Sequence, residues 1–217
     1  MIRKIKDFIW NLLIGLKIGG AVQLLLTGYL KDIGWYRSFN TKKSVDKNGN
    51  PIPWCTYPYV EFISAKLNNS MEVFEYGSGN STLWYAERVK KITTVEHNES
   101  WMKQLLNKLP SNVNLMYRRL GDGNNYVESI GEEGKKYDMI IVDGRNRVEC
   151  VKTAIDFLKP DGVMVIDNSN LSIYKDAIDF LNKKNYWSLD FFGISPVTPH
   201  TNCTSVFYMK NTENQFI

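Results

Sequence analysis

Two glycines and two acidic residues between positions 75 and 96 have the spacing of a nucleoside-binding site. Gly77 and Gly79 follow a short apolar run, and Glu96 ends a second apolar run about twenty positions later. A glycine turn at the end of a strand lets a ligand approach the backbone. An acidic residue after the next strand can accept hydrogen bonds from two ribose hydroxyls. The pattern therefore predicts an adenosine-containing ligand.

The glycine spacing argues against two common kinds of nucleotide site. Dinucleotide-binding turns carry three glycines as G-x-G-x-x-G, and Thr82 stands where the third glycine belongs. The phosphate-binding pattern G-x-x-x-x-G-K-[ST] is absent from the sequence. An NAD-dependent oxidoreductase with the same general architecture stays an alternative, as does a nonenzymatic adenosine-binding or assembly protein.

Strands and helices alternate from residue 71 to the end of the chain, which is typical of a doubly wound sheet. The runs 136–144 and 162–168 are almost continuously apolar, as expected of parallel strands covered on both faces. Residues 194–203 contain two prolines and leave no room for a crossover helix, so the two strands that they join should be antiparallel. The seven expected strands are residues 71–76, 91–97, 113–120, 136–144, 162–168, 187–193 and 204–210, and the expected helices are 81–90, 98–109, 147–158 and 174–185.

With these elements in place, the chain resembles the class I S-adenosylmethionine-dependent methyltransferases. The first motif of that family is an acidic residue, any residue and then Gly-x-Gly, which Glu75, Gly77 and Gly79 match. The family also closes its parallel sheet with one reversed edge strand, unlike dinucleotide-binding domains. The resemblance covers about residues 53–217. It implies an α/β fold, a Rossmann-like doubly wound seven-stranded sheet with an antiparallel last strand, and S-adenosylmethionine as the cofactor.

The resemblance also assigns roles to polar residues at the ends of the expected strands. The turn 77–79 would let the methionine half of the cofactor lie against the backbone, and Glu96 would hold the ribose. Asp122 would face the adenine amino group, and Asp143 would lie near the methionine amino group and the acceptor. Each position also suits an ordinary surface turn or helix cap. The full expected cofactor-binding set is Glu75, Gly77, Ser78, Gly79, Glu96, His97, Asp122 and Asp143.

Asp143, Asp167 and Asn168 together raise the question of a metal ion. Carboxylate and amide oxygens at neighbouring strand ends are ligands for a hard divalent cation. The three residues resemble the magnesium site of the catechol and caffeoyl-coenzyme A O-methyltransferases. The chain departs from that pattern at Arg145 and Arg147, whose guanidinium groups would compete with a cation or pair with an acidic substrate group. We therefore expect activity without Mg²⁺, and these three residues are the candidate ligands if a metal is needed.

Methylation of a hydroxyl or amine requires the acceptor to lose a proton to a base. Of the two histidines in the sequence, His200 lies in the connection between the last two strands, where it is either a base or an exposed loop residue. Asp143 is the other candidate for this catalytic role. Trp54, Tyr57 and Tyr59 either wall the site or pack in the core.

The composition fits one globular domain with a short appendage. The chain has 217 residues, 43% of them hydrophobic, and a formal net charge of +4. Its basic residues are scattered, whereas nucleic-acid binding would need a concentrated stripe, so we expect no nucleic-acid partner. The three cysteines, Cys55, Cys150 and Cys203, lack metal-ligand spacing, and their odd number favours free thiols in a cytoplasmic protein.

Residues 1–52 are a different kind of sequence from the expected catalytic domain at residues 53–217. A helix is predicted at the start, with one apolar stripe and basic residues mostly outside it. The Gly19-Gly20 pair interrupts the apolar character, so we expect no membrane span. Residues 1–33 either cap the sheet, pair with a second subunit in a homodimer, or contact an anionic membrane surface peripherally, and the polar residues 38–54 should form a separating loop. The stripe consists of Ile2, Ile5, Phe8, Ile9, Leu12, Leu13 and Leu16.

These features together predict an S-adenosylmethionine-dependent methyltransferase that acts on an oxygen of a small molecule or a glycan. The choice of oxygen depends on the Asp-Asn resemblance and on the lack of nucleic-acid features. An amine acceptor stays open, because no motif identifies the acceptor.

Overall fold

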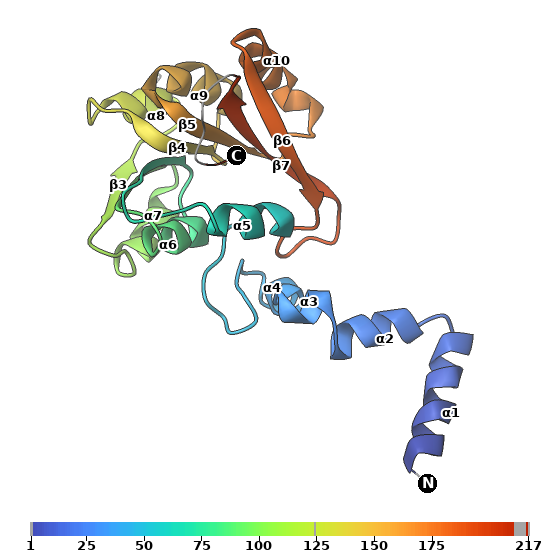
Figure 1. Ribbon diagram of the computed structural model, residues 1–217. Coiled ribbons are helices and arrows are strands. Elements are labelled where there is room, and N and C mark those ends of the chain that lie inside the picture. Colours follow the sequence, from blue (N-terminus) through green and yellow to red (C-terminus); the bar gives the residue numbers. More distant parts are fainter. Residues whose placement is uncertain (1, 124, 211–215, 217) are drawn as a thin grey trace.

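The computed structural model describes residues 2–123, 125–210 and 216, and a seven-stranded sheet lies at the centre of this part of the chain (Figure 1). The strand order is β3-β2-β1-β4-β5-β7-β6. Strands β1 to β5 are parallel, and β7 runs antiparallel to both of its neighbours, which confirms the predicted sheet. The strands are β1 Glu72–Tyr76, β2 Lys91–Glu96, β3 Val113–Tyr117, β4 Tyr137–Val142, β5 Leu158–Asp167, β6 Tyr186–Gly193 and β7 Asn202–Met209.

The reversed strand lies inside the sheet, so the expectation of a reversed edge strand is wrong. β7 pairs with β5 on one side and with β6 on the other, which leaves β6 at the edge. Burial explains this order. Residues 203–207 of β7 are all buried, whereas β6 alternates and leaves Trp187 and Phe192 exposed. A continuously buried strand suits the interior of a sheet, and an alternating strand suits its edge.

The helix before β5 is shorter than predicted. α9 spans Arg147–Ala154 and a 3-10 turn follows at Ile155–Phe157, so Leu158 belongs to the strand and not to the helix. Pro160 disfavours helical backbone at the residue before it. Leu158 instead pairs with Tyr137 of β4, after which the register shifts. β5 therefore starts before the apolar run that predicted it.

Helices cover both faces of the sheet, and α8, α9 and α10 lie opposite α5 and α6 (Figure 1). Side chains alternate along a strand, so Phe74 and Tyr76 of β1 pack in one hydrophobic layer and Val73 packs in the other. α8, which follows the turn after β3, was not predicted. The remaining helices of this region are α5 Tyr57–Ser64, α6 Asn80–Ala86, α7 Glu99–Leu106, α8 Asn125–Glu128 and α10 Lys175–Lys183.

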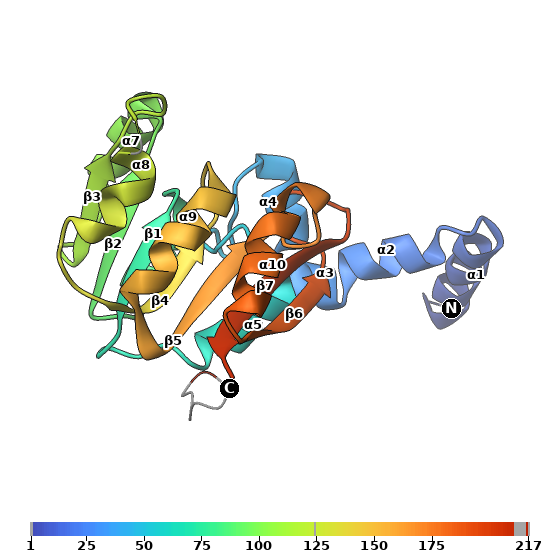
Figure 2. The same ribbon diagram turned by 90° about the horizontal axis from the view of Figure 1, so that it is seen from above.

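Helices α1 to α4 precede the sheet. α1 buries none of its residues, and together with α2 it extends away from the sheet in two views (Figure 1, Figure 2). α1 is therefore not a cap on the sheet. No helix in the described part of the chain has the length and apolar character needed to cross a membrane. The four helices are α1 Ile2–Gly15, α2 Gly19–Leu26, α3 Tyr29–Asp32 and α4 Trp35–Thr41.

Residues 38–41 of the expected loop belong to α4, and the polar residues that follow contact the start of α6. Ser44 and Val45 are buried, and the Asn80 side chain at the start of α6 donates a hydrogen bond to the Ser44 carbonyl at 2.6 Å. Asp46 organises the turn, because its carboxylate accepts hydrogen bonds from three backbone N–H groups that follow it. The domain boundary at residue 52 stays a prediction.

Candidate active site

Two adjoining pockets open at the carboxyl ends of the parallel strands, which is the edge where ligands of open α/β sheets bind. The smaller one, of about 300 Å³, contains Gly77, Ser78, Glu96 and His97, and we call it the glycine-turn pocket. The larger one, of about 510 Å³, is named the Trp54 pocket after its aromatic wall. Asp143, just after β4, lines both pockets.

The two glycines of the turn differ in what their backbone requires. Gly77 has a φ of +92°, and a Cβ there would lie 3.0 Å from the Cα of Gly144, so this position demands glycine. Gly79 has extended backbone, and a Cβ there would meet only the Trp101 ring, at 3.8 Å. The fold alone therefore does not need glycine at position 79, and only a ligand lying on the turn would.

Glu75 supports the glycine turn from inside the protein. Its buried carboxylate accepts hydrogen bonds from the hydroxyls of Ser81 and Thr82 in the first turn of α6. Thr82 Oγ1 accepts a further bond from the N–H of Gly79 at 3.0 Å. Burial raises the pKa of Glu75 to about 7, although these hydrogen bonds oppose the shift. Glu75 lines neither pocket, so it holds the turn in place from behind.

Glu96 joins the end of β2 to the glycine turn. Its Oε2 accepts hydrogen bonds from the N–H and the hydroxyl of Ser78 at 3.2 and 3.0 Å. Its Oε1 accepts from the backbone N–H groups of His97 and Asn98 at 2.8 and 2.7 Å. Nδ1 of His97 also lies 3.0 Å from Oε1, without the geometry of a hydrogen bond. Glu96 is only 4% exposed, and its hydrogen bonds fix both carboxylate oxygens at the wall of the pocket.

Asp122, like Glu75 and Gly79, is an expected cofactor residue outside the lining of both pockets. It sits in an exposed turn after β3, where Gly121 and Gly123 form a bridge, and it lines neither pocket. Its role toward adenine stays a prediction. The structure does bring the glycine turn, Glu96, His97 and Asp143 to one pocket.

Trp101 supports the site and was missed by the sequence-based prediction. Asn98 caps α7 by accepting a hydrogen bond from the backbone N–H of Trp101 at 3.0 Å. The indole N–H of Trp101 then donates to the carbonyl of Ser78 at 2.7 Å. The indole therefore fixes the glycine turn from the side of α7. The capping residue after the second strand is the signal that would have placed it there.

Asp143 and Asp167 bring two carboxylates together at the ends of β4 and β5. Burial raises the pKa of Asp143, and the charge of Asp167 raises it further, while Arg147 opposes the shift. Burial also raises the pKa of Asp167, although its Oδ1 accepts a hydrogen bond from Thr204 at 2.6 Å. The pair therefore holds a proton more readily than an isolated carboxyl group does.

Arg147, the first residue of α9, lies across both strand ends. Its Nη2 donates to the carbonyl and to the Oδ1 of Asp143 at 3.0 and 2.8 Å. Its Nη1 donates to the carbonyl of Asp167 and to the Oδ1 of Asn168 at 2.5 and 3.0 Å. Arg145, also expected beside the carboxylates, is exposed and lines the glycine-turn pocket. Only one of the two arginines therefore pairs with Asp143.

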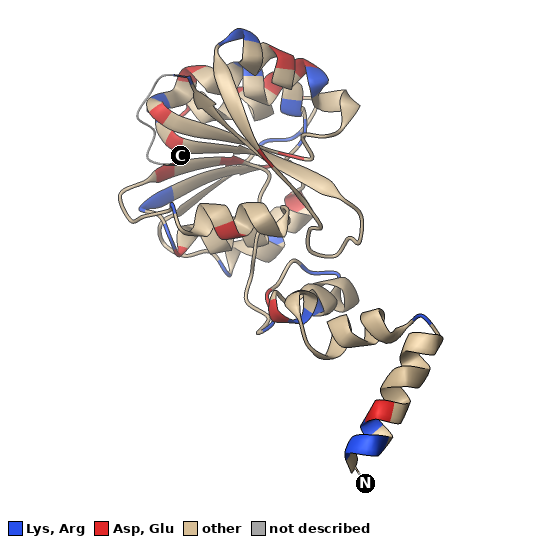
Figure 3. Ribbon diagram, turned by 45° about the vertical axis from the view of Figure 1, so that its right-hand side comes forward, with Lys and Arg blue, Asp and Glu red and all other residues tan. Residues whose placement is uncertain are grey.

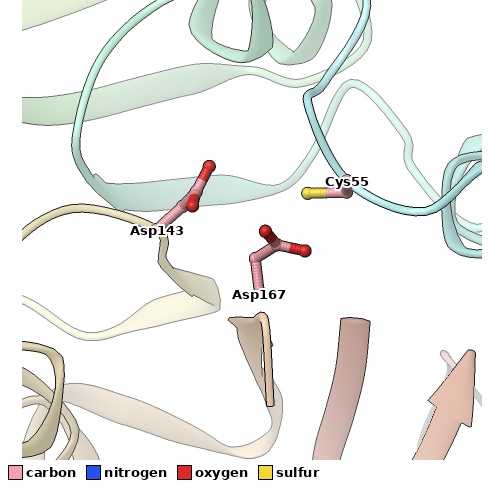
Figure 4. Close-up of side chains that lie close together, drawn as sticks. All are labelled: Cys55, Asp143 and Asp167. Carbon is pink, nitrogen blue, oxygen red and sulfur yellow. The ribbon is translucent and has the colours of Figure 1, made fainter. Parts of the chain in front are cut away.

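Cys55 is a second residue that the sequence-based prediction did not place here. Its thiol points toward the carboxyl groups of Asp143 and Asp167, and one atom of each residue lies within 4.8 Å of the others (Figure 4). Burial raises the pKa of the Cys55 thiol well above its usual value, and the two carboxylates add to the shift. The raised pKa disfavours the thiolate, which is the reactive form of a cysteine.

The Trp54 pocket combines an exposed indole with polar side chains, among them the carboxyl groups of Asp143 and Asp167. Trp54 is 45% exposed, and His200 lines the same pocket from the connection between β6 and β7. Tyr57 and Tyr59 are instead buried, and the Tyr59 hydroxyl lies 2.8 Å from that of Tyr85 in the core. Of the three expected aromatic walls, only Trp54 reaches the site, while both candidate bases, Asp143 and His200, do.

A protein-family model matches the part of the chain that contains the residues of the glycine-turn pocket. Residues 74–169 match the family model described as "Methyltransferase domain". This chain is an S-adenosylmethionine-dependent methyltransferase. The match begins in β1 and ends just after β5, so it includes the glycine turn, Glu96 and both carboxylates. A comparison with curated protein sequences gave no match.

Solved structures of other methyltransferases have the same fold as this methyltransferase. The O-methyltransferase TomG from Streptomyces achromogenes, in complex with SAM, is 15% identical, with a TM-score of 0.57 over 89% of this chain and 96% of that chain. A putative O-methyltransferase from Klebsiella pneumoniae is 15% identical, with a TM-score of 0.57 over 88% and 95%. A precorrin-6y C5,15-methyltransferase from Geobacter metallireducens is 15% identical, with a TM-score of 0.55 over 70% and 87%. The family match and the reversed β7 remove the NAD-dependent oxidoreductase alternative.

Proposed function

We propose that this methyltransferase binds S-adenosylmethionine in the glycine-turn pocket and methylates an oxygen of a small molecule or a glycan in the Trp54 pocket. The observation that carries the proposal is that the two pockets meet at Asp143, which lines both. Methyl transfer needs a donor and an acceptor held in line. Two pockets with a shared wall supply that arrangement.

The glycine-turn pocket suits the cofactor through its charge and its open backbone. Glu96 presents a fixed carboxylate for the two ribose hydroxyls, and the turn 77–79 gives the methionine half a path along the backbone. Asp143 is proposed near the methionine amino group, where its charge is complementary. Asp122 stays the candidate for the adenine amino group, although its turn lies outside the pocket.

The lining of the Trp54 pocket supports a neutral acceptor rich in hydroxyl groups. Asn170, Thr198 and Asn202 offer amides and hydroxyls that both donate and accept hydrogen bonds. The half-exposed Trp54 ring adds an apolar surface against which the C–H face of a sugar or the ring of a phenol can pack. None of the described residues that line this pocket is Lys or Arg, so it lacks the cations that a phosphorylated acceptor would need.

Oxygen is preferred over nitrogen because the pocket offers hydrogen-bonding partners typical of hydroxyl recognition. Two of the similar structures are described as O-methyltransferases, which agrees with this choice. Bound S-adenosylmethionine supplies an electrophilic methyl group, which the acceptor oxygen takes as the carbon–sulfur bond breaks, leaving a methyl ether and S-adenosylhomocysteine.

Asp143 is the proposed base that takes the proton of the acceptor hydroxyl, and His200 is the alternative. Both line the Trp54 pocket, and Asp143 also faces the cofactor side. Burial and the neighbouring Asp167 raise the pKa of Asp143, which suits a group that accepts a proton near neutral pH. Arg147 holds one of its oxygens and leaves the carboxylate in place for the transfer.

A panel of sugars, phenols and amines, scored by release of S-adenosylhomocysteine, tests the acceptor class. Trp54→Ala should raise the KM of an accepted sugar or phenol about tenfold, equivalent to about 1.4 kcal/mol, with unchanged cofactor affinity. Trp187→Ala is the matched control, because Trp187 is similarly exposed, at 51%, and lies on β6 outside both pockets. Turnover of amines alone would refute the choice of oxygen.

We further propose that residues 1–33 contact an anionic membrane surface. Twelve of the nineteen large hydrophobic side chains exposed in the described residues lie between Ile2 and Tyr29, so the projecting helices carry most of this apolar surface. Basic residues lie beside it near the start of α1, and Asp7 is the only acidic residue of that helix (Figure 3). An apolar helix face bordered by cations suits anionic lipids better than a second copy with the same charges.

Co-sedimentation with vesicles tests this contact. The chain should bind vesicles of phosphatidylcholine with phosphatidylserine and bind pure phosphatidylcholine more weakly. The double variant Phe8→Asp and Leu12→Asp should lose binding, whereas Phe192→Asp, exposed on β6, should keep it. The membrane proposal would be rejected in favour of a homodimer by two results together. The wild-type chain would bind neither kind of vesicle, and it would sediment as a dimer that the double variant converts to a monomer.

A further inference from the structure

The residues considered for Mg²⁺ do not fit that ion. Asp143, Asp167 and Asn168 do lie at neighbouring strand ends, but each already gives a side-chain oxygen to a protein donor. Arg147 donates hydrogen bonds to Asp143 Oδ1 at 2.8 Å and to Asn168 Oδ1 at 3.0 Å. Thr204 donates one to Asp167 Oδ1 at 2.6 Å. The further group that faces the two carboxylates is the Cys55 thiol, a soft ligand that does not suit a hard cation.

We infer that the guanidinium of Arg147 is the resident cation of this site and stands where a divalent ion would otherwise be held. An arginine side chain has five N–H donors in a fixed planar fork. All five have acceptors here, because Nε donates to the Gly144 carbonyl at 3.1 Å, and each of Nη1 and Nη2 donates twice. These acceptors come from the ends of both β4 and β5. A single side chain thus supplies the charge and the directional contacts that an ion would supply.

Burial, an aromatic contact and the local backbone conformation hold Arg147 in this position. Its side chain is only 10% exposed, and the guanidinium lies over the Tyr174 ring at 5.0 Å. Asn146, directly before it, has a φ of +51°, a left-handed conformation that asparagine tolerates and that turns the chain into α9. Arg145, in the same turn, is exposed and has none of these contacts.

Arg147 therefore acts as a positioning residue. It fixes one oxygen of Asp143 and balances the charge of the carboxyl pair, so no metal is required to hold these groups in place. The consequence for proton transfer rests on the proposed function. The claim about the cation itself does not, and it can be tested without knowledge of the acceptor.

Titration with Mn²⁺, followed by electron paramagnetic resonance of the free ion, provides the test. The wild-type chain should show no specific Mn²⁺ site. Arg147→Ala leaves two carboxylates and an amide oxygen around a space without a cation, so it should bind Mn²⁺ at least about tenfold more tightly than the wild type. Arg147→Lys keeps a positive charge and should resemble the wild type. Arg145→Ala, which removes the same charge from the same turn, should gain no affinity.

Wild-type binding of one Mn²⁺ as tightly as in Arg147→Ala, or an equal gain in Arg145→Ala, would overturn the inference. If Arg147→Ala does not fold, the wild type and Arg147→Lys still test the claim. A specific Mn²⁺ site in the wild type refutes it, and the absence of such a site in both proteins supports it. Calorimetry on the same samples measures the binding of S-adenosylhomocysteine and so tests the proposed function separately. A wild-type chain that binds neither the nucleoside nor Mn²⁺ would reject the proposed cofactor site and leave the inference about Arg147 standing.

Discussion

Replacing Glu96 with alanine should weaken S-adenosylhomocysteine binding about tenfold to a hundredfold. The two carboxylate oxygens of Glu96 are held by the backbone N–H groups of Ser78, His97 and Asn98 at 2.7 to 3.2 Å, so they are fixed before a ligand arrives. Two ribose hydroxyls donating to this charged group would contribute about 1.5 to 3 kcal/mol net. Each 1.4 kcal/mol corresponds to about a factor of ten in the dissociation constant.

Titration calorimetry measures the loss directly. The matched control is Glu99→Ala, because Glu99 is an exposed residue of α7 that pairs with Lys103 and lies outside both pockets. Glu96→Ala also leaves several buried donors without an acceptor, so circular dichroism must confirm that it folds. Glu96→Gln keeps the shape and one acceptor oxygen, and it should fall between wild type and Glu96→Ala. An unchanged dissociation constant in folded Glu96→Ala would refute the ribose role.

Three other changes have separate outcomes. Gly77→Ala should lower the free energy of unfolding by about 1 to 3 kcal/mol in denaturant titrations, because its φ is +92° and Gly144 lies against it; an unchanged midpoint would contradict this. Burial raises the pKa of Glu75 from 4.5 to about 7, so its contribution to stability is full below pH 4.5 and is lost as the pH rises through about 7. Thermal unfolding of Glu75→Gln should lack this fall, and parallel pH profiles of variant and wild type would count against it. Asp143→Asn should lower kcat about a hundredfold while S-adenosylhomocysteine affinity changes less than about tenfold; if His200→Ala shows the larger loss, His200 is the base.

The alternation of strands and helices was readable from the sequence because each buried strand is a short apolar run between turn residues. The position of the reversed strand was not readable from those runs, since hydrophobicity does not encode which strands become neighbours. Trp187 and Phe192 of β6 are exposed whereas residues 203–207 of β7 are buried, a difference that the packed fold shows and that the sequence runs do not. Leu158 was assigned to a helix because its spacing fits one, but Pro160 and pairing with Tyr137 override that spacing.

The part of the site that lies at the ends of the parallel strands could be predicted from the sequence. The glycine turn, Glu96 and Asp143 come together because parallel strands end at one edge of the sheet. Cys55 precedes the sheet, so no spacing along the sequence connects it with Asp143, and only the packed fold brings the two together. The different needs of the two glycines also follow from the fold, because Gly77 has a φ of +92° whereas Gly79 has extended backbone.

Calorimetric titration of the wild-type chain with S-adenosylhomocysteine and with NAD tests the central claim most directly. The glycine turn and Glu96 at one pocket predict a micromolar dissociation constant for S-adenosylhomocysteine, equivalent to about 6 to 8 kcal/mol, and no binding of NAD. Binding of NAD without binding of S-adenosylhomocysteine would contradict it.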